Sequence, residues 1–259
     1  MTSRIDLENH PAAAFGFYQE FATLDGGWGT FPRHYLLYAS SGVFQLEVAQ
    51  MQWLLPPQRA AWIAADVPIR VSIRAPVTCC SVLYARASLP PPVASCRVFA
   101  LSPLAREMIR YAMRWGPDRA AEDGAADSFF MALATVCNEL AATPDQSWLP
   151  RPRSDELKRA VEHTLARLEG PLSFGEVARA ALVSERTLAR RFAEETNMTW
   201  RQFLRRARMI RAMELLAAGD ANVTETVAAI GFDSLSAFIT AFRSFTGETP
   251  AQYRKRFLA

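Results

Sequence analysis

Two arginines in the C-terminal half of the chain have the spacing of a surface that can bind DNA. Arg186 and Arg190 lie about 160 to 200° around a helical wheel from Leu188 and Phe192. A guanidinium group can donate two hydrogen bonds to guanine O6 and N7, or contact a phosphate. The pattern predicts a helix that presents arginines to a major groove, although an arginine surface that faces only water has the same pattern.

An internal repeat favours the DNA-binding interpretation over the solvated surface. At an offset of 50 residues the C-terminal sequence matches itself, which indicates a duplicated unit. Each copy predicts a helix, a tight turn and a second helix, followed by the start of a trailing helix. The matched residues are Val177-Ala178 with Val227-Ala228, Ser184 with Ser234, Leu188 with Phe238, Phe192 with Phe242, Thr196 with Thr246, Thr199 with Thr249 and Gln202 with Gln252.

Helix-start signals locate the elements of both copies. Ser173 and Glu176 form a capping box at the start of the first helix, and Ser184 and Ser234 are predicted N-caps of the two second helices. Residues 199–217 predict one long helix of about 28 Å, which can hold two recognition helices near the ~34 Å repeat of one DNA turn.

The sequence of the second copy predicts a contact surface that differs from the first. Its outward positions carry Ser236 and Thr240, which are short, so we expect positioning and shape contacts there. Arg243 lies further from the helix start and is expected to contact phosphate rather than a base edge. Three arginines of the long helix share one face that suits either phosphate contact or water: Arg201, Arg205 and Arg208.

Charge and cysteine usage agree with an intracellular DNA-binding protein. The net charge is +3, and after Pro150 there are 18 basic against 13 acidic residues, compared with 11 against 13 before it. That local surplus suits a polyanion. The four cysteines form no C-x-x-C pair, so we expect reduced thiols, no metal and no cofactor. No signal peptide or membrane span is predicted, which indicates a cytoplasmic protein.

The N-terminal half predicts an α+β arrangement. Period-two stretches between about residues 35 and 84 predict a small β-barrel or sandwich, and helical spacing follows over 104–113 and 129–140. Prolines at 150 and 152 block helix and ladder bonding and predict a linker. The predicted domains are a sensor or dimerisation domain (1–148), a linker (149–154) and an all-α domain with two helix-turn-helix motifs joined by a long helix (155–259).

The C-terminal repeat resembles the AraC/XylS family of transcription regulators over residues 172–257. Its second motif matches at Gly231-Phe232-Asp233-Ser234, Phe238, Phe242, Gly247, Pro250 and Tyr253-Arg254. The first copy departs from the family at Leu182, where a turn glycine is frequent, and at Asn197 and Trp200, where glycine and proline are frequent. The resemblance implies double-stranded DNA as a partner, and the predicted DNA-binding residues are Arg186, Ala189, Arg190, Arg191, Ser236, Ala237, Thr240 and Arg243.

The N-terminal half resembles the cupin-like sensor domains of this family, through His34, residues 36–42 and Leu55-Pro56-Pro57. Metal-binding cupins need several histidines and a carboxylate around one ion, and the chain has only three histidines. We therefore expect no metal and no catalytic residues, and a structural role for His34. The predicted effector-facing residues are the aromatics Tyr38, Phe44, Trp53 and Trp62.

Three functions fit these observations. The favoured one is a sequence-specific DNA-binding transcription regulator that responds to a small effector, forms a homodimer and acts on RNA polymerase. A metal-free cupin enzyme, an isomerase or hydrolase fused to a DNA-targeting module, is an alternative, although no Ser-His-Asp, Cys-His or paired-carboxylate arrangement is evident. A regulator without an effector, whose N-terminal domain only dimerises through its two helices, is the third.

Overall fold

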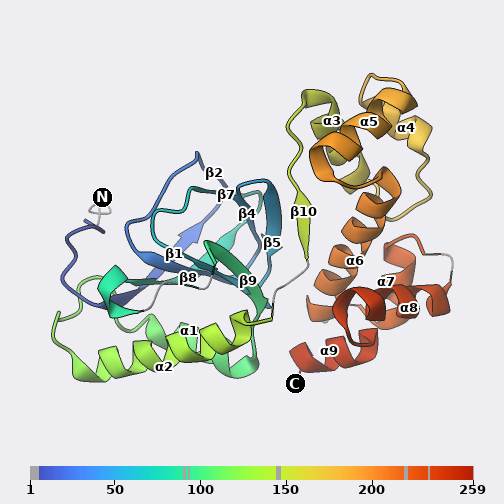
Figure 1. Ribbon diagram of the computed structural model, residues 1–259. Helices are drawn as coiled ribbons and strands as arrows, with labels where there is room; N and C mark the ends of the chain where they lie inside the picture. The colour runs from blue at the N-terminus through green and yellow to red at the C-terminus, as the bar shows by residue number, and fades with distance from the viewer. Residues whose placement is uncertain are drawn as a thin grey trace. The chain divides into compact units, whose positions relative to one another are not determined.

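A computed structural model describes residues 6–89, 92, 94–143, 147–218, 221–232 and 234–258. The chain forms two compact units (Figure 1). The first comprises residues 1–49 and 53–145, and the second comprises residues 50–52 and 146–259. Within the described residues, we find no helix with the length and apolar character needed to span a membrane.

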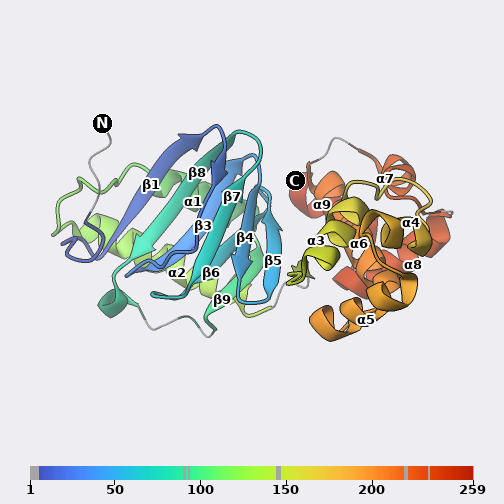
Figure 2. The same cartoon turned by 90° about the horizontal axis from the view of Figure 1, so that it is seen from above.

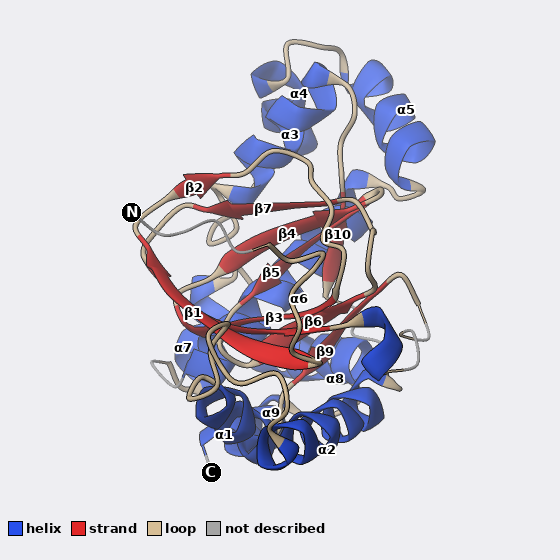
Figure 3. Cartoon of the chain, turned by 90° about the vertical axis from the view of Figure 1, so that its left-hand side faces the viewer, coloured by secondary structure: helices blue, strands red, loops and turns tan. Residues whose placement is uncertain are grey.

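The N-terminal unit is built from two antiparallel sheets that lie as separate layers (Figure 3), and Figure 2 shows their strands face-on. The first has the strand order β1-β8-β3-β6-β9, and in this unit the second has the order β5-β4-β7-β2. The strands are β1 (Ala14–Phe21), β2 (Leu24–Asp25), β3 (His34–Ser41), β4 (Phe44–Val48), β5 (Met51–Leu55), β6 (Arg59–Ile63), β7 (Ile69–Ile73), β8 (Val77–Tyr84) and β9 (Cys96–Ala100), with a 3-10 turn at Arg86–Ser88.

Strand β3 is buried on both of its faces. Successive side chains of a strand point to opposite sides, so Leu36 and Tyr38 pack in one cluster while Tyr35 and Leu37 face the other sheet. Its neighbour β8 is in register with it, with Tyr35 opposite Leu83. The apolar run of β3 is continuous because both environments exclude water.

Two helices cover the outer face of the first sheet (Figure 3). Helix α1 (Pro103–Ala112) begins at the N-cap Ser102, and α2 (Gly124–Ala141) begins at the N-cap Asp123, whose carboxylate accepts hydrogen bonds from two backbone N–H groups. That cap explains why α2 begins earlier than the apolar spacing indicates. Their buried side chains pack with Tyr38, Trp62 and Tyr84 of the sheet.

Within the described residues, the C-terminal unit is helical apart from the short strand β10 and the start of β5. Figure 1 shows α6 between two groups of helices, with α3, α4 and α5 at one end and α7, α8 and α9 at the other. The elements are β10 (Trp148–Pro150), α3 (Asp155–Leu165), α4 (Phe174–Ala180), α5 (Glu185–Thr196), α6 (Trp200–Ala218), α7 (Val223–Ala229), α8 (Leu235–Thr246) and α9 (Pro250–Leu258).

The strand β10 lies in the region where prolines were expected to prevent ladder bonding. Pro150 has no N–H, but the neighbouring Arg151 N–H donates to Gln50 O at 2.9 Å. The guanidinium of Arg206 on α6 lies 4.2 Å from the Trp148 ring centre, and its Nε–H donates to Trp148 O at 2.7 Å. Non-proline residues therefore hold this segment in an extended form.

Candidate nucleic-acid interface and internal cavity

The first helix-turn-helix motif consists of α4 and α5. The predicted capping box is present, since Glu176 N–H donates to Ser173 Oγ at 3.2 Å and Ser173 N–H donates to Glu176 Oε2 at 2.9 Å. Ser184 caps α5 by accepting from Thr187 N–H at 3.2 Å. The inner side chains of α5, Leu188 and Phe192, are both fully buried, so packing fixes the orientation of this helix.

The outward face of α5 carries the predicted residues of the first copy. Arg186, Ala189 and Arg190 are exposed, and they share one side of the helix because they are three and four residues apart. Arg190 Nε lies 4.0 Å from Glu194 Oε1, and its side chain is 65% exposed. An exposed pair at this distance holds the guanidinium weakly, so Arg190 is free to contact another group. Arg191 is half-buried beside this surface.

The second motif consists of α7 and α8. Asn222 and Glu225 form a second capping box, which we did not predict from the sequence. The Asn-x-x-Glu spacing is the sequence signal that predicts it. Ser234 caps α8 as predicted, and Asp233 lies outside the described residues. The inner residues Phe238 and Phe242 are fully buried. All four predicted outward residues are exposed: Ser236, Ala237, Thr240 and Arg243.

The two copies correspond at an offset of 50 residues only from Ser184 onwards. Their first helices correspond at 49, since the capping boxes begin at Ser173 and Asn222. The buried pair of α4, Val177-Ala178, therefore corresponds to Thr226-Val227, not to the predicted Val227-Ala228. One additional residue in the second turn accounts for the difference, and a fixed offset cannot detect it.

Each copy contains two turns, one between its two helices and one after the second helix, and each turn has a residue in the left-handed backbone conformation. Leu182 has a φ of 61° where the second copy has Gly231 at 64°, and Asn197 has a φ of 54° where the second copy has Gly247 at 83°. The departures from the family pattern at Leu182 and Asn197 thus keep the turn geometry. Asparagine tolerates this conformation, whereas it is strained for leucine.

Leu182→Gly is therefore expected to raise the free energy of unfolding by about 0.5–1 kcal/mol. The left-handed strain is relieved, part of the gain is offset by the flexibility of glycine in the unfolded chain, and the side chain is 79% exposed, so little burial is lost. Urea unfolding measures the change. The matched variant Asn197→Gly should change stability by only a few tenths of a kcal/mol. Destabilisation by Leu182→Gly would contradict this explanation of the turn.

The arginines of the long helix line one groove but differ in their hydrogen bonds. Arg208 donates to Leu168 O through Nε at 3.2 Å and to Gly170 O through a terminal nitrogen at 2.7 Å, so it holds the segment between α3 and α4. Arg201, Arg205 and Arg208 all line a groove of about 370 Å³ that α8 also lines, and of the three Arg201 and Arg205 are exposed. The sequence left phosphate contact and solvation equally open for these three arginines, and the structure adds that Arg208 is also held by backbone carbonyls.

A carboxylate on the inner side of α5 binds the segment that precedes α3. Glu195 accepts hydrogen bonds from Arg153 N–H at 2.7 Å, Ser154 N–H at 2.9 Å and Ser154 Oγ–H at 2.5 Å, while Arg191 Nη1 lies 4.0 Å away. Ser154 is also the N-cap of α3. The last residues of the predicted linker are therefore attached to the helix that carries the exposed arginines.

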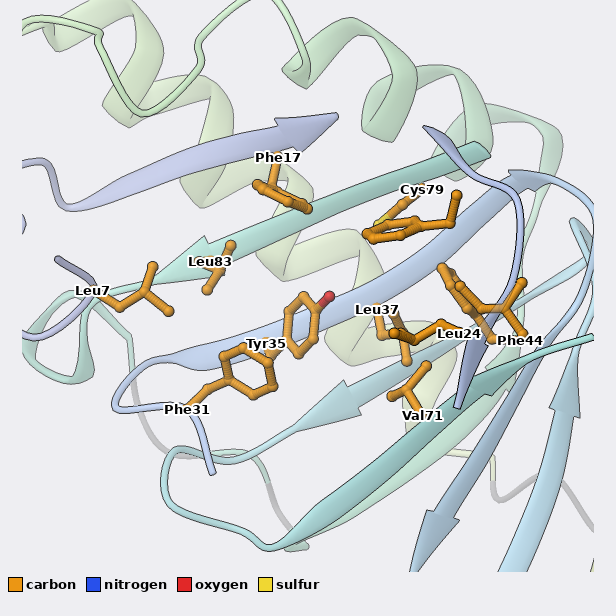
Figure 4. A pocket seen from close by; sticks show the side chains of 12 residues that line it. Leu7, Phe17, Leu24, Phe31, Tyr35, Leu37, Phe44, Val71, Cys79 and Leu83 are labelled. Atoms are coloured by element: carbon orange, nitrogen blue, oxygen red, sulfur yellow. The ribbon is translucent and has the colours of Figure 1, made fainter. Parts of the chain in front are cut away.

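The N-terminal unit contains a cavity of about 310 Å³ between its two sheets (Figure 4). Of the four predicted effector-facing residues, only Phe44 lines it. Tyr38 and Trp62 point the other way, into the core under α1 and α2, and Trp53 is buried elsewhere. The lining residues are Leu7, Phe17, Phe21, Leu24, Phe31, Tyr35, Leu37, Phe44, Val71, Ile73, Cys79 and Leu83.

His34 has the environment of a structural residue. Its Nδ1 accepts a hydrogen bond from Ala65 N–H at 3.1 Å, and the residue is 5% exposed. Burial, together with the charge of Arg86, lowers the pKa of His34 below its ordinary value, which favours the neutral ring. Across the described residues, no three His, Cys, Asp or Glu side chains gather in a group that could hold a metal ion.

Comparisons with known proteins agree with this geometry. Residues 177–256 match a family model described as a helix-turn-helix domain. The chain is 29% identical over 225 residues to the HTH-type transcriptional regulator NimR of Escherichia coli (strain K12), covering 85% of this chain and 79% of NimR. It is 31% identical over 131 residues to the HTH-type transcriptional activator RhaR of the same strain, covering 50% of this chain and 45% of RhaR.

A solved structure of a transcriptional regulator with an AraC-type DNA-binding domain, from Chromobacterium violaceum, is 28% identical. It covers 39% of this chain and 91% of the solved chain, with a TM-score of 0.38. The matched family model and the NimR relative, with the two helix-turn-helix motifs, show that the chain is a sequence-specific DNA-binding transcription regulator, and its C-terminal unit is similar to those of AraC-type regulators.

Proposed function

We propose that α5 reads base edges in one major groove, that α8 enters the next groove, and that a small effector in the N-terminal cavity alters DNA binding. Arg186 and Arg190 would contact bases, with Ala189 beside them and Arg191 next to the backbone. Ser236, Ala237 and Thr240 would make shape contacts, and Arg243 would contact phosphate. The proposed domains are residues 1–148, 149–154 and 155–259.

The observation that carries the DNA-contact proposal is the division of α5 into two sides. Leu188 and Phe192 have no exposed surface. On the other side Arg186 and Arg190 are exposed, and their one ion pair with another described residue is the weak contact of Arg190 with Glu194. A recognition helix needs this arrangement, because one side must fix its position while the other stays accessible to base edges. The cavity in the N-terminal unit has the size of a small-molecule site, and this size supports the proposal that an effector binds there.

The proposed partners rest on exposed apolar residues and on the similarity to transcription regulators. Exposed apolar side chains on α1 and α2, which are Leu104, Tyr111 and Met131, support a homodimer through these helices. Contact with RNA polymerase follows from the regulatory role, and the DNA partner supports action in the cytoplasm. If the cavity binds no effector, the same helices would support the alternative of a purely dimeric regulator.

Methylation protection tests the proposed docking. The full chain, bound to the DNA that flanks its own gene, should shield guanine N7 atoms from dimethyl sulfate in two segments about 10 base pairs apart on one face of the duplex. Guanine N7 lies in the major groove, so this reagent reports that groove directly. Protection of a single segment would exclude entry of α8 into a second major groove, and no protection at any salt concentration would contradict major-groove binding.

A further inference from the structure

The cavity between the two sheets is almost entirely apolar. Its walls are aromatic and aliphatic side chains, most of them from β1, β3, β4, β7 and β8, together with Leu7, Leu24 and Phe31, and Figure 4 shows the Tyr35 oxygen among them. Tyr35 shares hydrogen bonds with Ser81 and Cys79, and Cys79 Sγ lies 3.1 Å from Ser81 Oγ. Polar atoms in the lining are therefore concentrated in one small group on β3 and β8.

No charge faces this cavity from the described residues. None of the twelve lining side chains is Asp, Glu, Lys, Arg or His. Burial raises the pKa of Tyr35 far above its ordinary range and raises the pKa of Cys79 to about 11, so both groups are neutral at pH 7. On the adjacent strands, the Arg70 guanidinium is paired with Asp25 at 2.6 Å and lies 3.7 Å from Glu47.

From this lining we infer the chemical class of the effector: an uncharged compound of one or two rings with a single hydroxyl group, bound with that hydroxyl next to Tyr35. The inference rests on the proposed effector role of this cavity. A volume of about 310 Å³ is near the lower limit for small-molecule sites, which suits a compact ring system. Tyr35 can accept one more hydrogen bond, because a phenol oxygen has two lone pairs.

The same lining discriminates against anions. A carboxylate that enters this cavity leaves its hydration shell and meets no cationic side chain among the lining residues. Desolvation of an unpaired charge is costly, so an acid should bind roughly 100-fold more weakly than a neutral compound of the same shape. A carboxylate-binding pocket would need an arginine, lysine or histidine in its wall.

Three probes of nearly the same shape test the inference: 2-naphthol, methyl 2-naphthoate and 2-naphthoate, titrated into the full chain at pH 7 by calorimetry. We expect both neutral probes to bind and 2-naphthoate to bind roughly 100-fold more weakly. The methyl ester is larger than the acid, so weak binding of the acid alone cannot come from size. Equal affinity of the acid would overturn the neutral class and leave the effector role intact, whereas no binding of any probe would contradict both.

Two tyrosines of β3 provide a matched pair of variants. Tyr35→Phe should weaken the binding of 2-naphthol roughly 3- to 10-fold. The affinity for 2-methylnaphthalene, which has no hydroxyl, should stay unchanged. Tyr38→Phe removes the same hydroxyl group on the opposite face of the strand and should change the affinity for neither probe.

Val71→Trp fills the cavity from a half-buried position and should abolish binding of every probe while DNA binding persists. Equal effects of both tyrosine variants, or full binding by the Val71 variant, would place the ligand elsewhere.

Discussion

Arg190→Ala is expected to weaken binding to the specific DNA site by about 1–3 kcal/mol and to relax the preference for one base. The Arg190 guanidinium lies on the exposed side of α5, where its only ion pair within the described residues is the 4.0 Å contact with Glu194. A bidentate contact to guanine supplies discrimination of this size, and its loss leaves the other bases almost equally acceptable. Fluorescence anisotropy at one fixed salt concentration, with the target and four single-base variants, measures both effects.

Arg243→Ala provides the contrasting variant. Arg243 is exposed near the end of α8, so its removal should weaken all DNA sequences similarly and reduce the salt dependence by about one charge. Both arginines are exposed, so neither variant should alter the unfolding transition by more than about 0.5 kcal/mol. An Arg190→Ala protein with unchanged affinity and base preference would contradict the assigned role, and uniform weakening would make Arg190 a phosphate contact.

The helical half of the molecule could be predicted well because its signals are local. N-cap residues and buried side chains four apart determine where α5 and α8 begin and which side faces the core. Ser184 and Ser234 are confirmed as N-caps, and Leu188 and Phe192 as core residues. The repeat register differs by one residue in the first helices because an additional residue lies within a turn, where no periodicity constrains the sequence.

The cavity could not be located from sequence, for a physical reason. Alternation assigns Tyr35 and Tyr38 to opposite faces of β3, but both faces are buried, one under helices and one against a second sheet. Hydrophobicity is therefore equal on the two sides, and it does not distinguish a core tyrosine from a cavity tyrosine. Arg208 is a similar case, because its partners are backbone carbonyls that are distant in sequence and carry no residue signal.

Glu195 connects the segment before α3 to α5. The side chain is only 6% exposed, and its partners Arg153 and Ser154 are about forty residues earlier in the chain. Because Ser154 also caps α3, displacement of this segment would disturb α3 and α5 together. Burial raises the pKa of Glu195, but hydrogen bonds from Ser154 and Arg153 and the charge of Arg191 lower it more, so its pKa is below the ordinary 4.5.

Glu195→Gln is accordingly expected to lower the free energy of unfolding by about 1–3 kcal/mol at pH 7, since an amide replaces a buried carboxylate that accepts three hydrogen bonds. A carboxyl group with a lowered folded pKa stabilises the protein above pH 4.5, and the stabilisation is lost as pH falls through the folded value. The difference in free energy of unfolding between wild type and variant should thus be constant from pH 6 to pH 8 and shrink below about pH 4.5.

Urea unfolding followed by helical circular dichroism measures this difference. Glu194→Gln, which changes an adjacent carboxylate that is 53% exposed, is the control and should have a near-zero effect. If the two variants are equally stable at pH 7, Glu195 does not hold the segment before α3 against α5.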